Sequence, residues 1–382
     1  MSYDLRVWGR QAANLAECLL PSQGWTERDG GWALEKRSWQ IVVSGPQHVE
    51  PEDVPADAAD ALPGLAVLVE MSLEPGAAPK AAHSALLSSA RAVAGALAGL
   101  VEDPQEGSVA LARGEKRYAK PKREERFTVV DLSWWFVASP LRATGGTAEL
   151  IRILSNHLPE AVPRRYGLWE PPQYKTDETG PEALANFLRE NLDNSAVFYP
   201  TRPVVGLSLA DCDAQEHPRL GFRSNRLSIE LEIEALRQPG WERATKRLWR
   251  DISRLLQPFY GEARVLSGLT WAGATTGSDM RTDVHPVRSW FWRGIPPTPG
   301  LAIVLGPPYV ALWPMVDAER SGELVFVEHP DWSSGESLHL QVPTDLAQRW
   351  EPSWMQGEHG GYAVNWCDEY PSTWPFAGGT NS

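Results

Sequence analysis

The segment RLSIELEIEAL, residues 226–236, alternates apolar and polar side chains without a break from Leu227 to Glu234. Successive side chains of a β-strand point to opposite faces, so this period of two predicts a strand over 227–235 with one buried face. A slip of one residue would invert both faces, so the alternation also fixes the register. The side chains expected to be buried are Leu227, Ile229, Leu231 and Ile233, and those expected in solvent include Glu230, Glu232 and Glu234.

A helix and a second strand are expected after this segment. PGWERATKRLWRDISRLL, residues 239–256, opens with a proline, which is favoured in the first turn of a helix, and it carries one apolar side. PFYGEARVLSGLTW, residues 258–271, is expected to return as a strand. The connection is long enough for a crossover between parallel strands, and an antiparallel return also fits. The apolar side of the helix comprises Trp241, Ala244, Leu248, Ile252 and Leu255.

The chain upstream mixes strands and helices in the same way. We therefore predict an α+β fold with two mixed or antiparallel sheet units, each covered by helices. Further strands are expected at 3–9, 65–75 and 127–139 and as a hairpin over 32–45, and further helices at 11–20, 77–101, 145–158 and 180–192.

The expected helix 77–101 is long and Ala-rich, which raises the question of a membrane span. Lys80, His83 and Arg91 interrupt it, and its larger apolar residues recur at helical spacing. This pattern is typical of an amphipathic helix packed on a core rather than of a span. The packed residues are expected to be Leu86, Ala90, Val93, Leu97 and Leu100.

Charge and composition divide the chain into three parts. Residues 1–112 are expected to form an N-terminal α+β domain, and residues 113–126, with seven Lys or Arg and three Glu, a charged linker. Residues 127–382 are expected to form a second α+β domain. From about residue 286 that domain becomes rich in Trp and Pro, and short strands are expected at 301–306, 323–328 and 338–342.

The net charge of −13 and the pI near 5.2 limit the classes of partner. Such a field repels nucleic acid and anionic membranes and attracts basic proteins. The N-terminus lacks a signal-peptide pattern, so we expect a cytoplasmic protein. The three cysteines, Cys18, Cys212 and Cys367, form no close pair, which disfavours both a disulfide framework and a zinc site.

No motif for a catalytic site, a metal or a cofactor stands out, and we expect none of the three. Asp211, Asp213, Glu216 and His217 are suitable metal ligands, but their short polar segment is more typical of a surface loop. Cys18 is expected to be a small buried apolar side chain. His359, Cys367 and Asp368 could form a nucleophilic site only if the fold aligned them.

Two features are candidates for partner binding. The first is the acidic set Glu230, Glu232 and Glu234. The second is the aromatic segment WFWRGIPPTPGLAIVLGPPYVALWP, residues 290–314, because Trp and Tyr are enriched both in interface centres and in cores. Its candidate contact residues are Trp290, Trp292, Tyr309 and Trp313.

The segments RVLSGLTWAG (264–273) and 290–314, together with PRRYGLWEPPQ (163–173), resemble bacterial immunity proteins. These proteins are encoded beside polymorphic or type VI secretion toxins. Among them, the sequence most resembles the immunity protein 52 family. The resemblance implies a non-enzymatic protein that binds and neutralises a cognate toxin, which the acidic charge suggests is basic. Two alternatives remain: an enzyme with an unfamiliar site, or a carbohydrate or small-ligand module that stacks its ligand on Trp290, Trp292 and Trp313.

Overall fold

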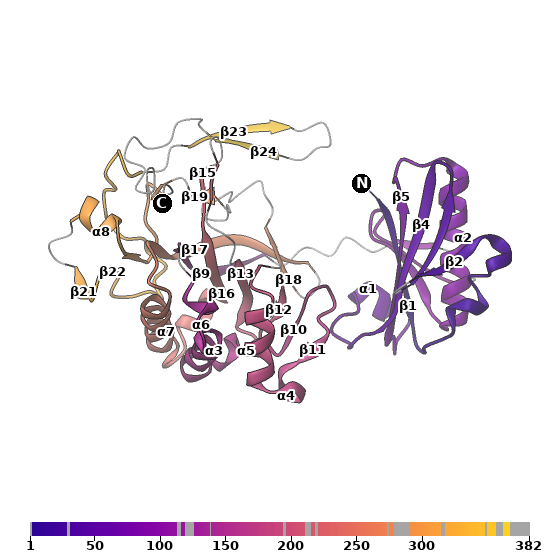
Figure 1. Cartoon of the computed structure of the whole chain (residues 1–382), viewed down its shortest axis with the longest axis horizontal. Helices are drawn as coiled ribbons and strands as arrows, with labels where there is room; N and C mark the ends of the chain where they lie inside the picture. The colour runs from indigo at the N-terminus through magenta and orange to yellow at the C-terminus, as the bar shows by residue number, and fades with distance from the viewer. Residues whose placement is uncertain are drawn as a thin grey trace. The chain divides into compact units, whose positions relative to one another are not determined.

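The computed structural model describes residues 2–28, 31–112, 116–118, 126–137, 139–193, 196–210, 215–217, 221–272, 275–278, 291–292, 294–314, 318–347, 350–356 and 362–366. The chain divides into two compact units, Met1–Glu124 and Glu125–Ser382 (Figure 1). Each unit is built on a large antiparallel sheet with helices packed against it, which confirms the α+β class. In the described ranges, no helix has the length and apolar character needed to cross a membrane.

The sheet of the first unit has eight strands in the order β2-β3-β4-β5-β1-β6-β7-β8. Its last strand, β8, lies inside the segment 113–126 that was expected to be a linker, so that expectation was wrong for three residues. These three residues form a strand because pairing with β7 satisfies backbone N–H and C=O groups that water would hydrogen-bond in an unpaired linker. The strands are β1 (Tyr3–Gly9), β2 (Trp25–Arg28), β3 (Gly31–Lys36), β4 (Trp39–His48), β5 (Val67–Glu74), β6 (Leu100–Asp103), β7 (Ser108–Leu111) and β8 (Lys116–Tyr118).

Helix α2 (Lys80–Ala96) covers one face of this sheet, and Leu86, Ala90 and Val93 are buried against it as the helical spacing predicted. The short helix α1 (Ala56–Ala61) packs on the opposite face, around Trp8. Helices therefore pack on both faces of the sheet of the first unit.

The predicted helix 11–20 was wrong. This stretch contains only a 3₁₀ turn, Leu15–Glu17, and a second one, Pro21–Gln23, follows. Pro21 disfavours helical geometry in the residue before it, which ends any helix within a few residues. Cys18 is half-buried, and burial raises the pKa of its thiol, so it is neutral at physiological pH.

The sheet of the second unit has the order β13-β16-β9-β17-β20-β22-β21, with β18 paired to β17. Strands β16 and β17 both pair antiparallel with β9, which lies between them, so they run parallel to each other. The helix between them therefore makes the crossover connection. These strands are β9 (Phe127–Phe136), β13 (Val204–Ala210), β16 (Asn225–Glu232), β17 (Tyr260–Ala272), β18 (Thr275–Ser278), β20 (Ala302–Leu305), β21 (Glu319–Ser321) and β22 (Leu324–Glu328).

Helices α3, α5 and α7 pack on one face of this sheet, with α3 in contact with both of the others (Figure 1). Trp134 of β9 is fully buried there, 4.8 Å from the ring of Trp249, and its indole N–H donates to Ser253 Oγ at 2.9 Å. The helices are α3 (Gly146–His157), α4 (Thr176–Thr179), α5 (Pro181–Glu190), α6 (Ile233–Leu236), α7 (Trp241–Leu256) and α8 (Tyr309–Leu312), and further 3₁₀ turns occur at Pro140–Arg142 and Pro159–Ala161.

The alternating segment behaves as predicted on its apolar side. Leu227, Ile229 and Leu231 are fully buried, and Ile233 is nearly so. The strand ends at Glu232, however, because Ile233–Leu236 forms the helical turn α6. The expected strand 227–235 was therefore too long by three residues, and Glu234 lies on the turn and not on the strand.

The opposite face of β16 was expected in solvent, which was wrong because side chains of neighbouring strands cover it. Ser228 is buried, and Glu230 and Glu232 are half-buried. In the same face, Asp131 pairs with Arg226 at 3.5 Å. Oε1 of the fully buried Glu262 accepts hydrogen bonds from Arg264 Nη2 at 2.5 Å and from Gly300 N at 2.6 Å. The middle of this face is thus a buried row of ion pairs.

Three smaller sheets complete the second unit, in the orders β11-β10-β12, β14-β15-β19 and β23-β24. Residues 338–342, expected to be a strand, form no strand in the described part of the chain, although Leu338 N donates to Gly300 O at 2.7 Å. The remaining strands are β10 (Arg165–Gly167), β11 (Tyr174–Lys175), β12 (Val197–Tyr199), β14 (Gln215–His217), β15 (Gly221–Arg223), β19 (Phe291–Trp292), β23 (Trp350–Gln356) and β24 (Tyr362–Trp366).

An ion pair between α3 and α7 should make stability depend on acid pH. Nε2 of His157 lies 2.7 Å from Oδ2 of Asp251, and Arg254 Nη1 donates to Oδ1 of the same carboxylate at 2.7 Å. Burial alone would raise the pKa of Asp251, but the bonds and charges of His157 and Arg254 lower it overall. A carboxylate whose pKa is lowered by folding stabilises the fold above its unfolded pKa, and this contribution is lost as the pH falls through the folded pKa.

We therefore expect Asp251→Asn to flatten the acid side of the stability profile. The measurement is the free energy of unfolding in urea at a series of pH values between about 2 and 6. The exposed Asp177 provides the control, since Asp177→Asn should leave the profile as it is in the wild type. A profile unchanged by Asp251→Asn would contradict the assigned role.

Candidate functional site

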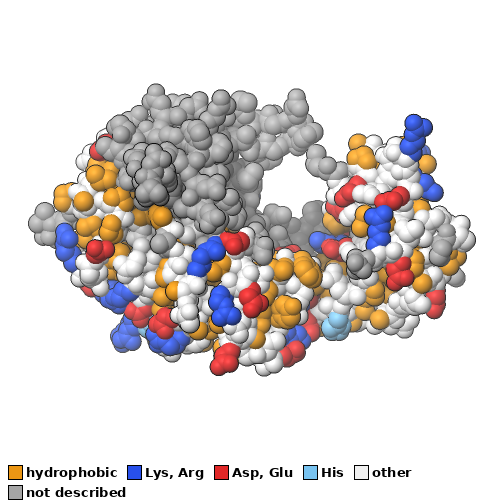
Figure 2. Space-filling model, viewed as in Figure 1, with side chains coloured by type: hydrophobic (Ala, Val, Ile, Leu, Met, Phe, Trp, Pro, Cys, Tyr) orange, Lys and Arg blue, Asp and Glu red, His pale blue; other side chains and the backbone are white. Residues whose placement is uncertain are grey.

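The most exposed aromatic side chain among the described residues lies in the loop Leu168–Gln173, between β10 and β11. Trp169 is 56 % exposed, Tyr174 at the end of the loop 48 % and Leu168 38 %. Single exposed apolar residues are common on protein surfaces, but a cluster that includes Trp and Tyr is typical of interface centres. Figure 2 shows apolar side chains gathered over this small sheet. We call the loop together with Tyr174 the aromatic loop.

Hydrogen bonds hold the aromatic loop in one conformation. The amide of Gln173 donates to the carbonyls of Trp169 and Pro171, both at 2.7 Å, and its oxygen accepts from Leu168 N at 2.9 Å. The buried guanidinium of Arg165 donates to Pro172 O at 2.9 Å. A loop that is already ordered loses little entropy on binding, so its exposed side chains are suited to recognition.

Gly167, at the end of β10, leaves space for the Gln173 side chain that makes these hydrogen bonds. A Cβ atom at Gly167 would lie 2.2 Å from Gln173 Oε1, so only glycine allows the Gln173 side chain to fold back over the backbone. Tyr174 packs against Tyr166 and Phe187 at ring distances of 5.4 and 5.9 Å. The exposed ring is therefore supported by the buried Tyr166 of β10 and the partly buried Phe187 of α5.

A groove with a volume of about 270 Å³ borders the aromatic loop. Its walls come from the loop, from β12 and β13 and from β16, and they include Glu170, Phe198, Leu207 and Glu230. Gly206 faces Glu230 across the two strands, and a Cβ atom there would lie 3.1 Å from its carboxylate. The lining of the groove thus combines apolar side chains with the two carboxylates of Glu170 and Glu230.

The three glutamates predicted to form one acidic face have three different environments. Glu230 lines the groove, and Glu232 lies 3.4 Å from Arg202, measured from Oε1 to Nε. Glu234 is exposed on α6. Only Glu230 therefore lies beside the aromatic loop.

The predicted aromatic contact residues are mostly internal. Trp292 and Tyr309 are buried in one cluster with Trp135 and Tyr260, and the indole N–H of Trp292 donates to the Tyr309 hydroxyl at 2.8 Å. Trp313 is partly buried against the same cluster, and Trp290 lies outside the described residues. Burial gives Trp292 and Tyr309 a structural role, so a partner could not reach them in this fold.

The residues weighed for metal or nucleophilic chemistry lie largely outside the described part of the chain. This holds for Asp211, Asp213, His359, Cys367 and Asp368, while Glu216 and His217 are described only as backbone of β14. Among the side chains that are described, no group of three or more His, Cys, Asp or Glu is placed to hold a metal ion.

The sequence did not predict the aromatic loop as a contact site, although residues 163–173 are among the segments that carry the resemblance. Its signal was available in RYGLWEPPQYK, where a Trp precedes two prolines between short strand-forming residues. The buried ion pairs also had a signal, because FTVVDLSWWF and YGEARVL place charges within otherwise apolar strands. With 18 Trp in the chain, however, no pattern separates an exposed Trp from the buried ones.

The bracing of the aromatic loop can be tested directly. Gln173→Ala removes three hydrogen bonds while leaving the exposed Trp169 in place, so we expect faster backbone exchange and faster proteolytic cleavage in the loop. Hydrogen exchange of the loop peptides is the measurement. Gln238→Ala, at an exposed position two residues after α6, serves as the control and should leave the loop unchanged. Equal exchange rates in Gln173→Ala and the wild type would show that the hydrogen bonds of Gln173 do not hold the loop in its conformation.

Comparisons with known proteins give a distant structural similarity and no family. No family model matches the chain, and no curated protein sequence matches it. Among solved structures, the chain is similar to the Pseudomonas aeruginosa T6SS protein PA0821, with 14% identity and a TM-score of 0.37. The match covers 53% of this chain and 65% of that protein, just under two thirds of its length.

Proposed function

We propose that this protein is a non-enzymatic binding protein of the immunity type, which neutralises a bacterial toxin by forming a stoichiometric complex with it. The observation that carries the proposal is the aromatic loop, because it presents Trp169 and Tyr174 to solvent on a braced backbone. Exposed Trp and Tyr on ordered elements are the residues that most often dominate the energy of protein interfaces.

Charge supports a basic partner. The groove beside the loop is bordered by Glu170 and Glu230, and the whole chain carries a net charge of −13. Such a field would speed the encounter with a basic toxin, and raising the salt concentration would slow it. The proposal also places the protein in the cytoplasm of the cell that makes the toxin.

Co-expression tests the proposal. Each neighbouring gene that encodes a secreted toxin candidate would be expressed in a sensitive host, with and without this protein. The proposal expects one such gene to stop growth and the wild-type protein to restore it. If no neighbour is toxic, or if toxicity persists in the presence of the protein, the immunity function is rejected. A sugar-binding function would then be the next to test, since Trp169 could also stack on a sugar ring.

A further inference from the structure

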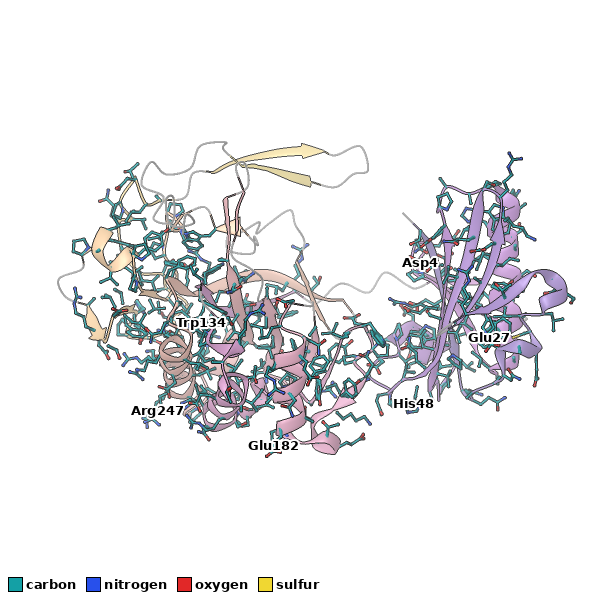
Figure 3. The ribbon with its side chains drawn as sticks, in the orientation of Figure 1. Asp4, Glu27, His48, Trp134, Glu182 and Arg247 are labelled. Carbon is teal, nitrogen blue, oxygen red and sulfur yellow. The ribbon has the colours of Figure 1, made fainter. Side chains whose placement is uncertain are left out.

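A second surface of the Glu125–Ser382 unit has the opposite charge. Helix α7 carries five basic and two acidic side chains, a net charge of +3, in a chain whose net charge is −13. Figure 2 shows Lys and Arg side chains over this helix, where Figure 3 labels Arg247. Since α3 lies between α5 and α7, this surface is separate from the aromatic loop on the α5 side (Figure 1).

The basic side chains of α7 line a groove of about 480 Å³ between the N-terminal half of the helix, the end of α6 and β22. We call it the basic groove. Its charged lining comprises Arg243, Lys246, Arg247 and Arg250 with Glu242 and Glu328.

Two of the four cations are already neutralised within the fold. Lys246 lies 2.5 Å from Glu242 Oε1 and also donates to Pro330 O at 2.7 Å. Arg250 lies 2.8 Å from Glu328 and 2.9 Å from Glu319. These pairs fix the walls of the groove and account for both of its carboxylates.

The positive charges of the other two cations, Arg243 and Arg247, are not paired in this way. Both side chains are exposed, and no carboxylate of the described residues forms an ion pair with either. They stand one helical turn apart on the same side of α7, a spacing of roughly 6 Å between Cβ atoms. The groove therefore presents two guanidinium groups side by side with a surplus of positive charge.

We propose that the basic groove binds an acidic segment of a partner protein, with Arg243 and Arg247 each pairing with one carboxylate. Guanidinium groups form paired hydrogen bonds with carboxylates, and the spacing of one turn matches two acidic side chains along one peptide. A nucleic acid would extend beyond the groove into the acidic field of the remaining surface, so the net charge favours a short acidic peptide over a polyanion.

The test uses the full-length protein and a fluorescent deca-glutamate peptide. We expect binding at low salt that weakens as salt increases, and the double variant Arg243→Glu/Arg247→Glu should weaken it at least about tenfold, since two charge-assisted contacts are lost. The matched control is Arg152→Glu/Arg189→Glu, which makes the same change of charge on exposed faces of α3 and α5. This control should bind the peptide within about twofold of the wild type.

Three results would overturn the inference. The first is that the peptide does not bind, and the second is that the two double variants weaken binding equally. The third is that a single-stranded oligonucleotide or inorganic phosphate displaces the peptide at an equal concentration of charge. Trp169→Ala should leave peptide binding unchanged, because the aromatic loop is a separate surface. The peptide result and the toxin co-expression result can therefore fail independently of each other.

Discussion

Replacing Trp134 with alanine is expected to lower the free energy of unfolding of the Glu125–Ser382 unit by about 3–5 kcal/mol. Trp134 is fully buried between β9 and α7, where it contacts Trp249 and donates to Ser253 (Figure 3). The substitution leaves a cavity between the sheet and the helix layer, and the surroundings can fill it only in part. Denaturant unfolding followed by far-UV circular dichroism measures the loss.

The chain supplies a matched control for this substitution. Trp169→Ala makes the same chemical change at a side chain that is 56 % exposed, so we expect a change in stability of no more than about 0.5 kcal/mol. A loss below about 1 kcal/mol for Trp134→Ala, or equal losses for the two variants, would contradict the assigned packing.

Glu262→Ala is expected to destabilise the same unit by a similar amount, about 3–5 kcal/mol. Burial raises the pKa of Glu262, and the charge of Arg264 and the hydrogen bonds from Arg264 and Gly300 oppose that rise. Removing the carboxylate leaves the largely buried Arg264 without this partner and Gly300 N without its acceptor. A buried cation that loses its pair costs more than the pair itself contributed.

The control for this second variant is Glu182→Ala, at an exposed position of α5 (Figure 3). It should change the unfolding free energy by no more than about 0.5 kcal/mol. Stability that is the same in Glu262→Ala and Glu182→Ala would show that the Glu262–Arg264 pair is not needed for the fold.

The local patterns of the sequence predicted the class of fold and much of the core. Period-two alternation placed Leu227, Ile229 and Leu231 inside, because a strand with one buried face allows only one register. Helical spacing identified the buried side of α2 in the same way. Both predictions depend on neighbours within a few residues, which is the distance over which periodicity carries information.

Features that depend on distant residues could not be predicted. The polar face of β16 lies beside side chains of strands that are far away in sequence, since β9, which carries Asp131, and β13 pair with it. The exposure of Trp169 and the burial of Trp292 both follow from what packs around them, and not from their local sequence. The uncompensated charge of Arg243 and Arg247 likewise depends on which carboxylates the fold brings near α7.

The most direct test of the proposed function is the affinity of the purified protein for the toxin that co-expression identifies. Isothermal titration calorimetry should give one toxin bound per protein chain, and Trp169→Ala should weaken the complex by at least about 2 kcal/mol, roughly thirtyfold in Kd. Leu312→Ala, at another exposed apolar side chain, is the control and should bind as the wild type does. Wild-type affinity in Trp169→Ala, with its fold intact, would contradict a binding site at the aromatic loop.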